Sequence, residues 1–242
     1  MKAEYKLKHT PKGGQMKTFF TSDTHYGHTN ICRGESRWEG KRGCRDFDSV
    51  PEMNEAIIEG INSSVGKHDI LYHLGDWSFG GFKNIEKFRN RLDCKTIHLI
   101  TGNHDYQLLK SGLASLFTSV NQLKSRKVCG QMVSMCHFPL LVWENHSSKK
   151  HPSWMLHGHC HGSMKDKNYI ARKTLDVGID THPEFRPYAF EEIEAIMRKK
   201  EIKLRRGVIM RKGNQVKLIG KYPFCGNDGN VKYRWETIYR HV

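Results

Sequence analysis

The stretch MKTFFTSDTH, residues 16–25, decides the fold class because a short apolar run passes directly into a polar turn. Residues 16–22 have the length and composition of a buried β-strand. Asp23-Thr24-His25 follows where that strand should end. Open α/β sheets bind their ligands beyond the carboxyl ends of the strands. The stretch therefore predicts a strand that carries Asp23 and His25 into a binding site.

Four further polar clusters follow apolar runs in the same way. The runs are residues 69–74, 96–101, 127–136 and 153–156, and each is predicted to form one strand. The clusters that follow them are Gly75-Asp76, Gly102-Asn103-His104-Asp105, His137 and Gly158-His159-Cys160-His161. We expect the clusters to meet at one edge of the sheet structure, although they are far apart in the chain.

Helices are predicted between these strands, at residues 51–65, 84–92 and 190–200. Strands that alternate with helices indicate the α/β class. From residue 201 onward the pattern changes to short β-like segments. We therefore expect two domains, with residues 1–200 holding the site and residues 201–242 forming a small β-rich appendage.

The charge of the chain indicates an anionic partner. The formal net charge is +15, and residues 198–242 hold thirteen Lys or Arg against three Asp or Glu. The basic appendage is therefore a candidate for binding nucleic acid, with Tyr233 and Trp235 stacking on bases. The alternative is a small apolar core with a solvated basic rim.

The composition also bears on location. No run reaches the ~18 apolar residues of a membrane helix, so no membrane partner is expected. The seven cysteines are odd in number and scattered, which favours a reducing, cytoplasmic setting over a disulfide framework. The sequence carries no signal for the oligomeric state.

The clusters offer oxygen and nitrogen atoms that suit divalent cations. Asp76 has two carboxylate oxygens and can bridge two ions. A ligand set without thiolates accepts Mn, Fe, Zn, Ni or Mg-like ions, and Mn is our first expectation among them. The positive charge of two dications is larger than the negative charge of two aspartates and one hydroxide. The site therefore keeps a net positive charge, which favours an anionic substrate. The seven candidate ligands are Asp23, His25, Asp76, Asn103, His137, His159 and His161.

The order D-x-H, G-D, G-N-H-D, H and G-H-x-H over residues 19–161 resembles the calcineurin-like metallophosphoesterase superfamily, in particular small phosphoesterases of bacteria and their viruses. The resemblance implies a four-layered α/β/β/α sandwich of two mixed sheets flanked by helices. It assigns Asp23, His25, Asp76 and His161 to one metal, and Asp76, Asn103, His137 and His159 to the other. It also implies that His104 donates a proton to a phosphate oxygen and that Asp105 orients or polarises His104.

The predicted activity is metal-dependent hydrolysis of a phosphodiester or a phosphomonoester, by a hydroxide that the two metals bind. The diester and a nucleotide or nucleic-acid substrate are favoured. The alternative is a silent scaffold with this fold, or a nucleic-acid-binding module. His28 and Asn30 are candidates to bind substrate or to cap the next segment. Arg33, within a basic loop that also contains Arg37, Lys41, Arg42 and Arg45, binds a second phosphate or faces water.

Overall fold

The computed structural model describes residues 16–110, 112–148, 150–166, 169, 172–205, 210–212, 215–225 and 231–241. The chain divides into two compact units, Met1–Met197 and Arg198–Val242. The boundary that we expected at residue 200 falls inside helix α5, Phe190–Arg205. No helix in the described ranges has an apolar stretch long enough to cross a membrane.

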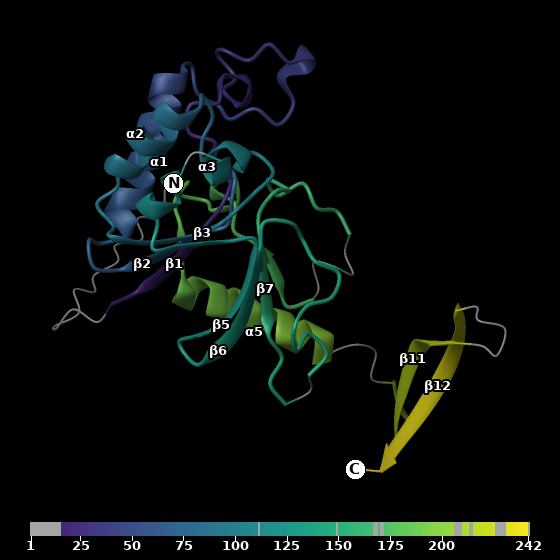
Figure 1. The fold of residues 1–242 in the computed structure, drawn as a ribbon. Helices are drawn as coiled ribbons and strands as arrows, with labels where there is room; N and C mark the ends of the chain where they lie inside the picture. The colour runs from purple at the N-terminus through teal and green to yellow at the C-terminus, as the bar shows by residue number, and fades with distance from the viewer. Residues whose placement is uncertain are drawn as a thin grey trace, which may run out of the picture. The chain divides into compact units, whose positions relative to one another are not determined.

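The second unit contains an antiparallel sheet in the order β10-β11-β12 (Figure 1). Its strands are Met210–Lys212, Gln215–Cys225 and Val231–His241. The predicted stacking of Tyr233 and Trp235 on bases concerns side chains that lie outside the described part of the structure.

The first unit is built around a five-stranded sheet in the order β4-β3-β2-β1-β9. Strands β1 to β4 are parallel neighbours, whereas β9 runs antiparallel to β1. The carboxyl ends of β1 to β4 therefore lie at the same edge of the sheet. The bounds are β1 Thr18–Thr21, β2 Ile70–His73, β3 Thr96–Ile100, β4 Ser119–Asn121 and β9 Tyr188–Ala189.

A second, four-stranded sheet has the order β5-β6-β7-β8 and is also mixed. Its strands are β5 Leu123–Val128, β6 Gln131–Cys136, β7 Trp154–His157 and β8 Thr174–Asp176. β5 and β6 pair antiparallel, and the other pairs are parallel.

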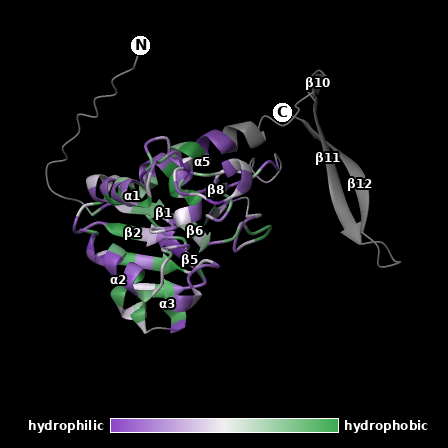
Figure 2. Ribbon diagram, turned by 90° about the horizontal axis from the view of Figure 1, so that it is seen from above, coloured by the Kyte–Doolittle hydropathy of each residue, from purple (hydrophilic) through white to green (hydrophobic). Residues whose placement is uncertain are grey.

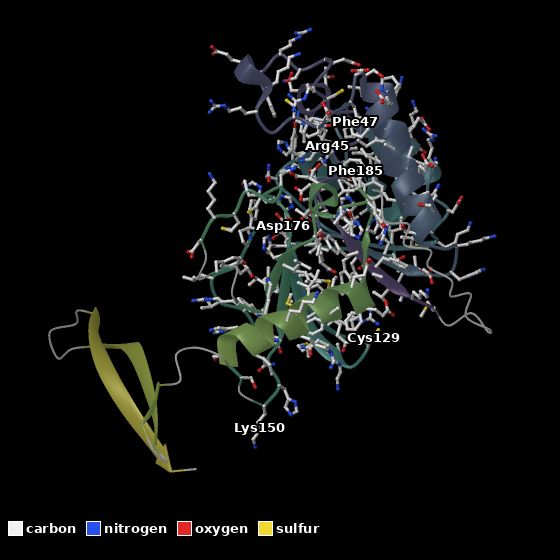
Figure 3. All side chains as sticks on the ribbon, turned by 180° about the vertical axis from the view of Figure 1, so that it is seen from behind. Arg45, Phe47, Cys129, Lys150, Asp176 and Phe185 are labelled. Carbon is white, nitrogen blue, oxygen red and sulfur yellow. The ribbon has the colours of Figure 1, made fainter. Side chains whose placement is uncertain are left out.

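The prediction of a single strand over residues 127–136 is wrong, because a hairpin divides it. Cys129 and Gly130 form the turn with φ of 47° and 86°. Two left-handed residues in a two-residue loop match the twist of the strands on either side. Figure 3 places Cys129 at this turn, near the N-terminal end of α5. The turn escaped prediction because cysteine rarely adopts positive φ.

The helices of the first unit follow ordinary end signals. Helix α1, Val50–Ser64, begins after Ser49, whose side chain accepts a hydrogen bond from the Glu52 backbone N–H. Helices α1 and α2 lie on one side of the five-stranded sheet (Figure 1), and their ribbons carry both hydrophilic and hydrophobic residues (Figure 2). The remaining helical segments are α2 Phe82–Asn90, α3 Tyr106–Lys110, η1 Thr29–Ile31, η2 Glu39–Lys41, η3 Leu113–Leu116 and η4 Ile179–Thr181.

The core forms layers because side chains alternate along the strands. Phe19 and Leu71 belong to the cluster with α1 and α2, whereas Phe20 and Tyr72 join the cluster that also contains the inner face of the second sheet. The predicted α/β fold with two mixed sheets is confirmed. The expected outer helix layer over the second sheet differs: α5 packs into the cluster between the sheets. Within the described residues, Leu140 and Trp143 cover the outer face of the second sheet.

Candidate metal centre

Backbone hydrogen bonds join the neighbouring polar turns within each sheet. The N–H of Asp23 donates to the carbonyl of Gly75 at 2.9 Å, and the N–H of His25 donates to the carbonyl of Asp76 at 3.0 Å. In the second sheet, the N–H of Gly158 donates to the carbonyl of His137 at 2.9 Å. The N–H of His159 donates to the carboxylate of Asp23 at 2.9 Å, which joins the turns of the two sheets beyond the strand ends.

The backbone at the centre adopts an uncommon conformation. Five of the seven candidate ligands have positive φ, a region that non-glycine residues seldom occupy. Such strain clusters where a fold must aim side chains at a functional site. The five are Asp23 at 55°, His25 at 47°, Asp76 at 56°, His159 at 68° and His161 at 46°.

Two glycines in the motifs are required by close approach. A Cβ on Gly158 would overlap the hydroxyl of Ser22 and the carboxylate of Asp23. A Cβ on Gly75, which has φ of +98°, would lie 2.5 Å from the backbone nitrogen of Gly102. Glycine therefore stands before the ligands in these turns because no side chain fits there.

A first group of ligand atoms comes from Asp23, His25 and His161, and these atoms lie within 4.8 Å of one another. The Nε2 atoms of His25 and His161 are 3.2 Å apart. Oδ1 of Asp23 lies 3.7 Å from Nε2 of His161 and 3.9 Å from Nε2 of His25. Nδ1 of His25 is buried and has no hydrogen-bond partner among the described residues.

A second group comes from Asp76, His137 and His159, again within 4.8 Å. Oδ1 of Asn103 lies 3.0 Å from Nε2 of His137. Oδ2 of Asp76 lies 3.4 Å from Nε2 of His137 and 3.5 Å from Nε2 of His25. One carboxylate oxygen is therefore within reach of both groups, as a bridging ligand must be.

The hydrogen bonding of these residues fits a pair of cations. Nδ1 of His137 lies 2.8 Å from the carbonyl of Leu74 and must donate to it, so Nε2 of the neutral ring presents a lone pair. The oxygens of Asn103 and Asp76 lie close to that lone pair, and a cation between these three atoms would bind all of them. Burial alone would lower the pKa of His137, but hydrogen bonding to Asp76 and the charge of Asp76 raise it. Burial, with Arg45 nearby, holds the pKa of His25 well below its ordinary value, which keeps this ligand neutral.

Asp180 and Arg45 form a support that sequence reasoning missed. Nδ1 of His161 donates to Oδ2 of Asp180 at 2.6 Å, and Nε of Arg45 donates to Oδ1 at 2.7 Å. The guanidinium of Arg45 also donates to the carbonyls of Asp23 and Thr24 at 2.5 and 2.7 Å. The sequence predicts for Arg45, as part of a basic loop, contact with a second phosphate or with water, and no motif singles out Asp180. No local pattern could have found a pair separated by 135 positions.

Arg45 is held from its other side by aromatic rings. Its guanidinium lies 5.4 Å from the centroid of the Phe185 ring, and the rings of Phe47 and Phe185 are 5.6 Å apart. Figure 3 shows the three residues together at the base of the loop that follows η1. Arg45 is therefore a buried structural cation, not a phosphate contact.

The carboxylate of Asp105 binds the backbone of two turns of the site. Its carboxylate accepts hydrogen bonds from the backbone N–H groups of Asp76 and Gly102 at 2.8 Å and of Trp77 at 3.0 Å. No hydrogen bond joins Asp105 to His104 in the described structure. Asp105 thus fixes the turns that carry Asp76 and Asn103, and an effect on the orientation of His104 would pass through this backbone.

His104 itself lies at the centre. Its backbone N–H donates to Oδ1 of Asp76 at 2.9 Å. Its ring packs 4.6 Å from the ring of Phe79 and makes no hydrogen bond to any described residue. The exposed imidazole is therefore held in place while its nitrogens remain available to a substrate.

Of the three predicted substrate-binding residues, only His28 lies at the centre. His28 stacks on Phe79, with ring centroids 3.7 Å apart, and burial lowers its pKa to about 4. Asn30 instead accepts from the backbone of Arg37, and Arg33 pairs with Asp46 at 3.0 Å. A cavity of about 280 Å³ opens over the centre and is lined by His25, His28, Ile31, Trp38, Asp76, Phe79, Asn103, His104, His159 and His161.

Cys160, between two candidate ligands in sequence, belongs to a separate group. It lies with His157 and Asp176, the three ligand atoms being within 4.8 Å. The carboxylate of Asp176 accepts from the backbone N–H groups of Gly162 and Gly178 at 3.0 and 2.9 Å. Burial and the charge of Asp176 raise the pKa of the Cys160 thiol to about 11. This group supports the turn that carries His159 and His161.

Comparison with known proteins agrees with this geometry. The chain is 27% identical over 191 residues to an uncharacterized protein of Methanocaldococcus jannaschii, covering 77% of this chain and 94% of that one. It is 28% identical over 190 residues to the gene 66 protein of Mycobacterium phage L5, covering 67% and 86%. The crystal structure of a protein of unknown function from Aquifex aeolicus shares the fold, with a TM-score of 0.55 and 20% identity over 75% of this chain and all of that one. The profile of the calcineurin-like phosphoesterases matches residues 16–182, and the chain belongs to that family.

Proposed function

We propose that this protein hydrolyses phosphodiesters with two divalent cations bound between its sheets. The observation that carries the proposal is the position of Asp76. Its Oδ2 lies 3.5 Å from His25 in one ligand group and 3.4 Å from His137 in the other. A carboxylate that joins two nitrogen and oxygen ligand groups is the arrangement that a dinuclear centre needs.

Asp23, His25, Asp76 and His161 would hold one cation, and Asp76, Asn103, His137 and His159 the other. Mn is our first choice, and Fe, Zn, Ni or Mg also suit oxygen and imidazole ligands. Bound cations would neutralise phosphate charge and lower the pKa of water from ~15.7 toward ~7.

His104 is the proton donor in this proposal. Its ring lies in the wall of the cavity over the centre, and contact with Phe79 limits its movement. Because no described residue occupies its nitrogens, an ester oxygen that departs from phosphorus can take a proton from it. General acids of this kind contribute ~10²–10⁴-fold to rate.

A nucleotide or nucleic-acid substrate is supported by the formal charge of +15, since polyanions are attracted to strongly basic surfaces. We place residues 201–242 in the same proposal, as a basic region that docks nucleic acid. Removing them should weaken nucleic-acid binding and reduce its salt dependence. Binding that is the same with and without these residues would leave the docking role without support.

The experiment compares hydrolysis of bis(p-nitrophenyl) phosphate, with Mn added, by the wild type, His104→Ala and Asp76→Asn. Metal content is measured on the same samples. His104→Ala should keep its metal and lose ~10²-fold or more in kcat, whereas Asp76→Asn should lose metal and activity together. His68→Ala, an exposed histidine before β2, is the control and should match the wild type. Equal rates in all four proteins would refute the assignment.

The rival scaffold function predicts a different result. A scaffold would carry substoichiometric metal and would not hydrolyse the ester with any of the metals. All seven candidate ligands are present and six of them fall into two convergent groups, which favours the enzyme.

A further inference from the structure

A second cavity adjoins the metal centre on the side of the loop that follows η1. Its volume is about 450 Å³. It shares Ile31, Trp38, His159 and His161 with the cavity over the centre, so the two spaces meet at the metal ligands. Its remaining wall includes Arg42 and Gly43 from the loop and Ser163 from the turn after His161.

The loop stands on a fixed base and projects from the first unit (Figure 1). The N–H of Arg33 donates to the carbonyl of Arg45 at 2.9 Å, and the N–H of Arg45 donates to the carbonyl of Ile31 at 2.7 Å. Arg45 then ties this base to the backbone of Asp23. A side chain on the loop is therefore presented at a set position relative to the metal ligands.

Trp38 offers an aromatic surface in this second cavity. It is 44% exposed, although it is one of the largest apolar side chains of the loop. Its ring stands perpendicular to the ring of His28, at 6.0 Å between centroids and 86° between planes. His28 in turn is stacked on Phe79. An exposed indole that its neighbours hold in place is a surface on which a planar base can stack.

Arg42 supplies the uncompensated charge. It is exposed and forms no ion pair or hydrogen bond with any described residue. Arg33 pairs with Asp46, and Arg45 pairs with Asp180, whereas Arg37 lies outside the cavity lining. Asp180 also lines the cavity, but Arg45 and His161 already bind its carboxylate. The free charge that a ligand meets on the loop side is therefore the guanidinium of Arg42, which suits a phosphate.

The position of His104 sets the direction of the substrate. His104 lines the cavity over the centre but not the loop cavity. The ester oxygen that departs must lie near its proton donor, so the substituent in the loop cavity is the one that stays on phosphorus.

We propose that the loop cavity binds a nucleoside that remains attached to the scissile phosphate, with its base against Trp38 and a further phosphate against Arg42. The inference rests on the proposed phosphodiesterase function and narrows its substrate to nucleotide diesters that carry a second phosphate. In the reaction, a water oxygen bonds to phosphorus and the P–O bond to the other substituent breaks. The departing oxygen takes a proton, and the nucleotide is released with a free terminal phosphate.

Three esters with the same leaving group test this inference. They are methyl p-nitrophenyl phosphate, thymidine 5′-(p-nitrophenyl phosphate), and the latter with a 3′-phosphate. All release p-nitrophenol, so differences in kcat/KM report the retained group. We expect the thymidine ester to exceed the methyl ester at least tenfold, and the 3′-phosphate to add a further gain.

The variants separate the two contacts. Trp38→Ala should reduce kcat/KM for the thymidine ester about tenfold more than for the methyl ester, chiefly through KM, because the base loses the aromatic ring on which it stacks. Trp38→Phe should restore part of the loss. Arg42→Gln should remove the gain from the 3′-phosphate. Arg37→Gln, on the same loop but outside the cavity lining, is the matched control. A thymidine ester no better than the methyl ester, or equal losses for both with Trp38→Ala, would overturn the inference.

Failure of the phosphodiesterase function gives a distinct result. If the wild type hydrolyses none of the three esters, calorimetry with thymidine 3′,5′-bisphosphate in the presence of Mn tests separately whether the loop cavity binds a nucleotide. Binding that weakens in both Trp38→Ala and Arg42→Gln would support the nucleotide site without the reaction. No binding, or binding that neither change affects, would overturn it.

Discussion

Oδ2 of Asp180 accepts a hydrogen bond of 2.6 Å from Nδ1 of His161. The contact fixes the proton of a neutral His161 on Nδ1 and leaves Nε2 to face His25 and Asp23. Burial would raise the pKa of Asp180, but the charge of Arg45 and the hydrogen bond from His161 outweigh it and hold the pKa below its ordinary value. An ionised acid behind a histidine ligand makes the ring a better donor to a cation.

Asp180→Asn should therefore weaken metal binding. Loss of an outer partner of this kind costs ~10–100-fold in metal affinity, which titration calorimetry with Mn can measure. Asp46→Asn, which removes the exposed partner of Arg33, is the control and should bind Mn as the wild type does. Wild-type affinity in Asp180→Asn would contradict the role given to Asp180.

Asp105→Asn should destabilise the fold. The amide cannot accept all three backbone hydrogen bonds from Asp76, Trp77 and Gly102, and each buried group left unpaired costs ~1–3 kcal/mol. Urea unfolding of metal-free protein measures the change, with the exposed Asp93→Asn as control. If Asp105 acted only on His104, kcat would fall while the free energy of unfolding stayed constant.

Gly158→Ala should damage both stability and metal binding. The added methyl group would overlap Ser22 and the carboxylate of Asp23, and overpacking of this kind costs ~1–3 kcal/mol. Gly66→Ala is the matched substitution, because its methyl group would approach only the carboxylate of Asp69, at 3.0 Å. Thermal unfolding and Mn binding should change in Gly158→Ala alone. Equal effects in the two variants would count against the close-approach explanation.

We expect His73 to make the free energy of unfolding depend on pH. It is fully buried, and burial lowers its pKa to about 3. Its Nδ1 accepts from the N–H of Gly75 at 3.3 Å, so Nε2 donates to the hydroxyl of Thr24 at 2.8 Å. Only the neutral ring satisfies both contacts.

The unfolded chain binds a proton on this histidine near pH 6.5, whereas the folded chain does so only near pH 3. The stabilisation is therefore complete above pH 6.5 and is lost as the pH falls toward 3, by at most about 1.4 kcal/mol per pH unit. The free energy of unfolding is measured at several pH values with a chelator present. Its slope against pH should be smaller in His73→Asn than in the wild type. The exposed His68→Asn should keep the wild-type slope, and an unchanged slope in His73→Asn would exclude this source.

Much of the fold could be predicted because its signals are local. The strand before Asp23 and helix α1 lie close to their expected positions, since apolar period and end residues are read from neighbouring amino acids. The turn at Cys129-Gly130 was missed because its backbone conformation runs against the preference of cysteine. Residues 190–200 were predicted to form a helix, but the packing of its side chains with both sheets depends on which faces the strands turn inward.

The sequence by itself determined the family and the set of candidate ligands, because the types and order of the motif residues are written in contiguous clusters. Only the tertiary structure decided which residues hold these ligands in position and which residues line the neighbouring cavity. In the folded protein the carboxylate of Asp105 accepts hydrogen bonds from three backbone N–H groups, and Arg45 pairs with Asp180. Trp38 and Arg42 line the loop cavity. The physical reason is distance along the chain: contacts between residues 136 positions apart arise from packing of the two sheets, which no local pattern encodes.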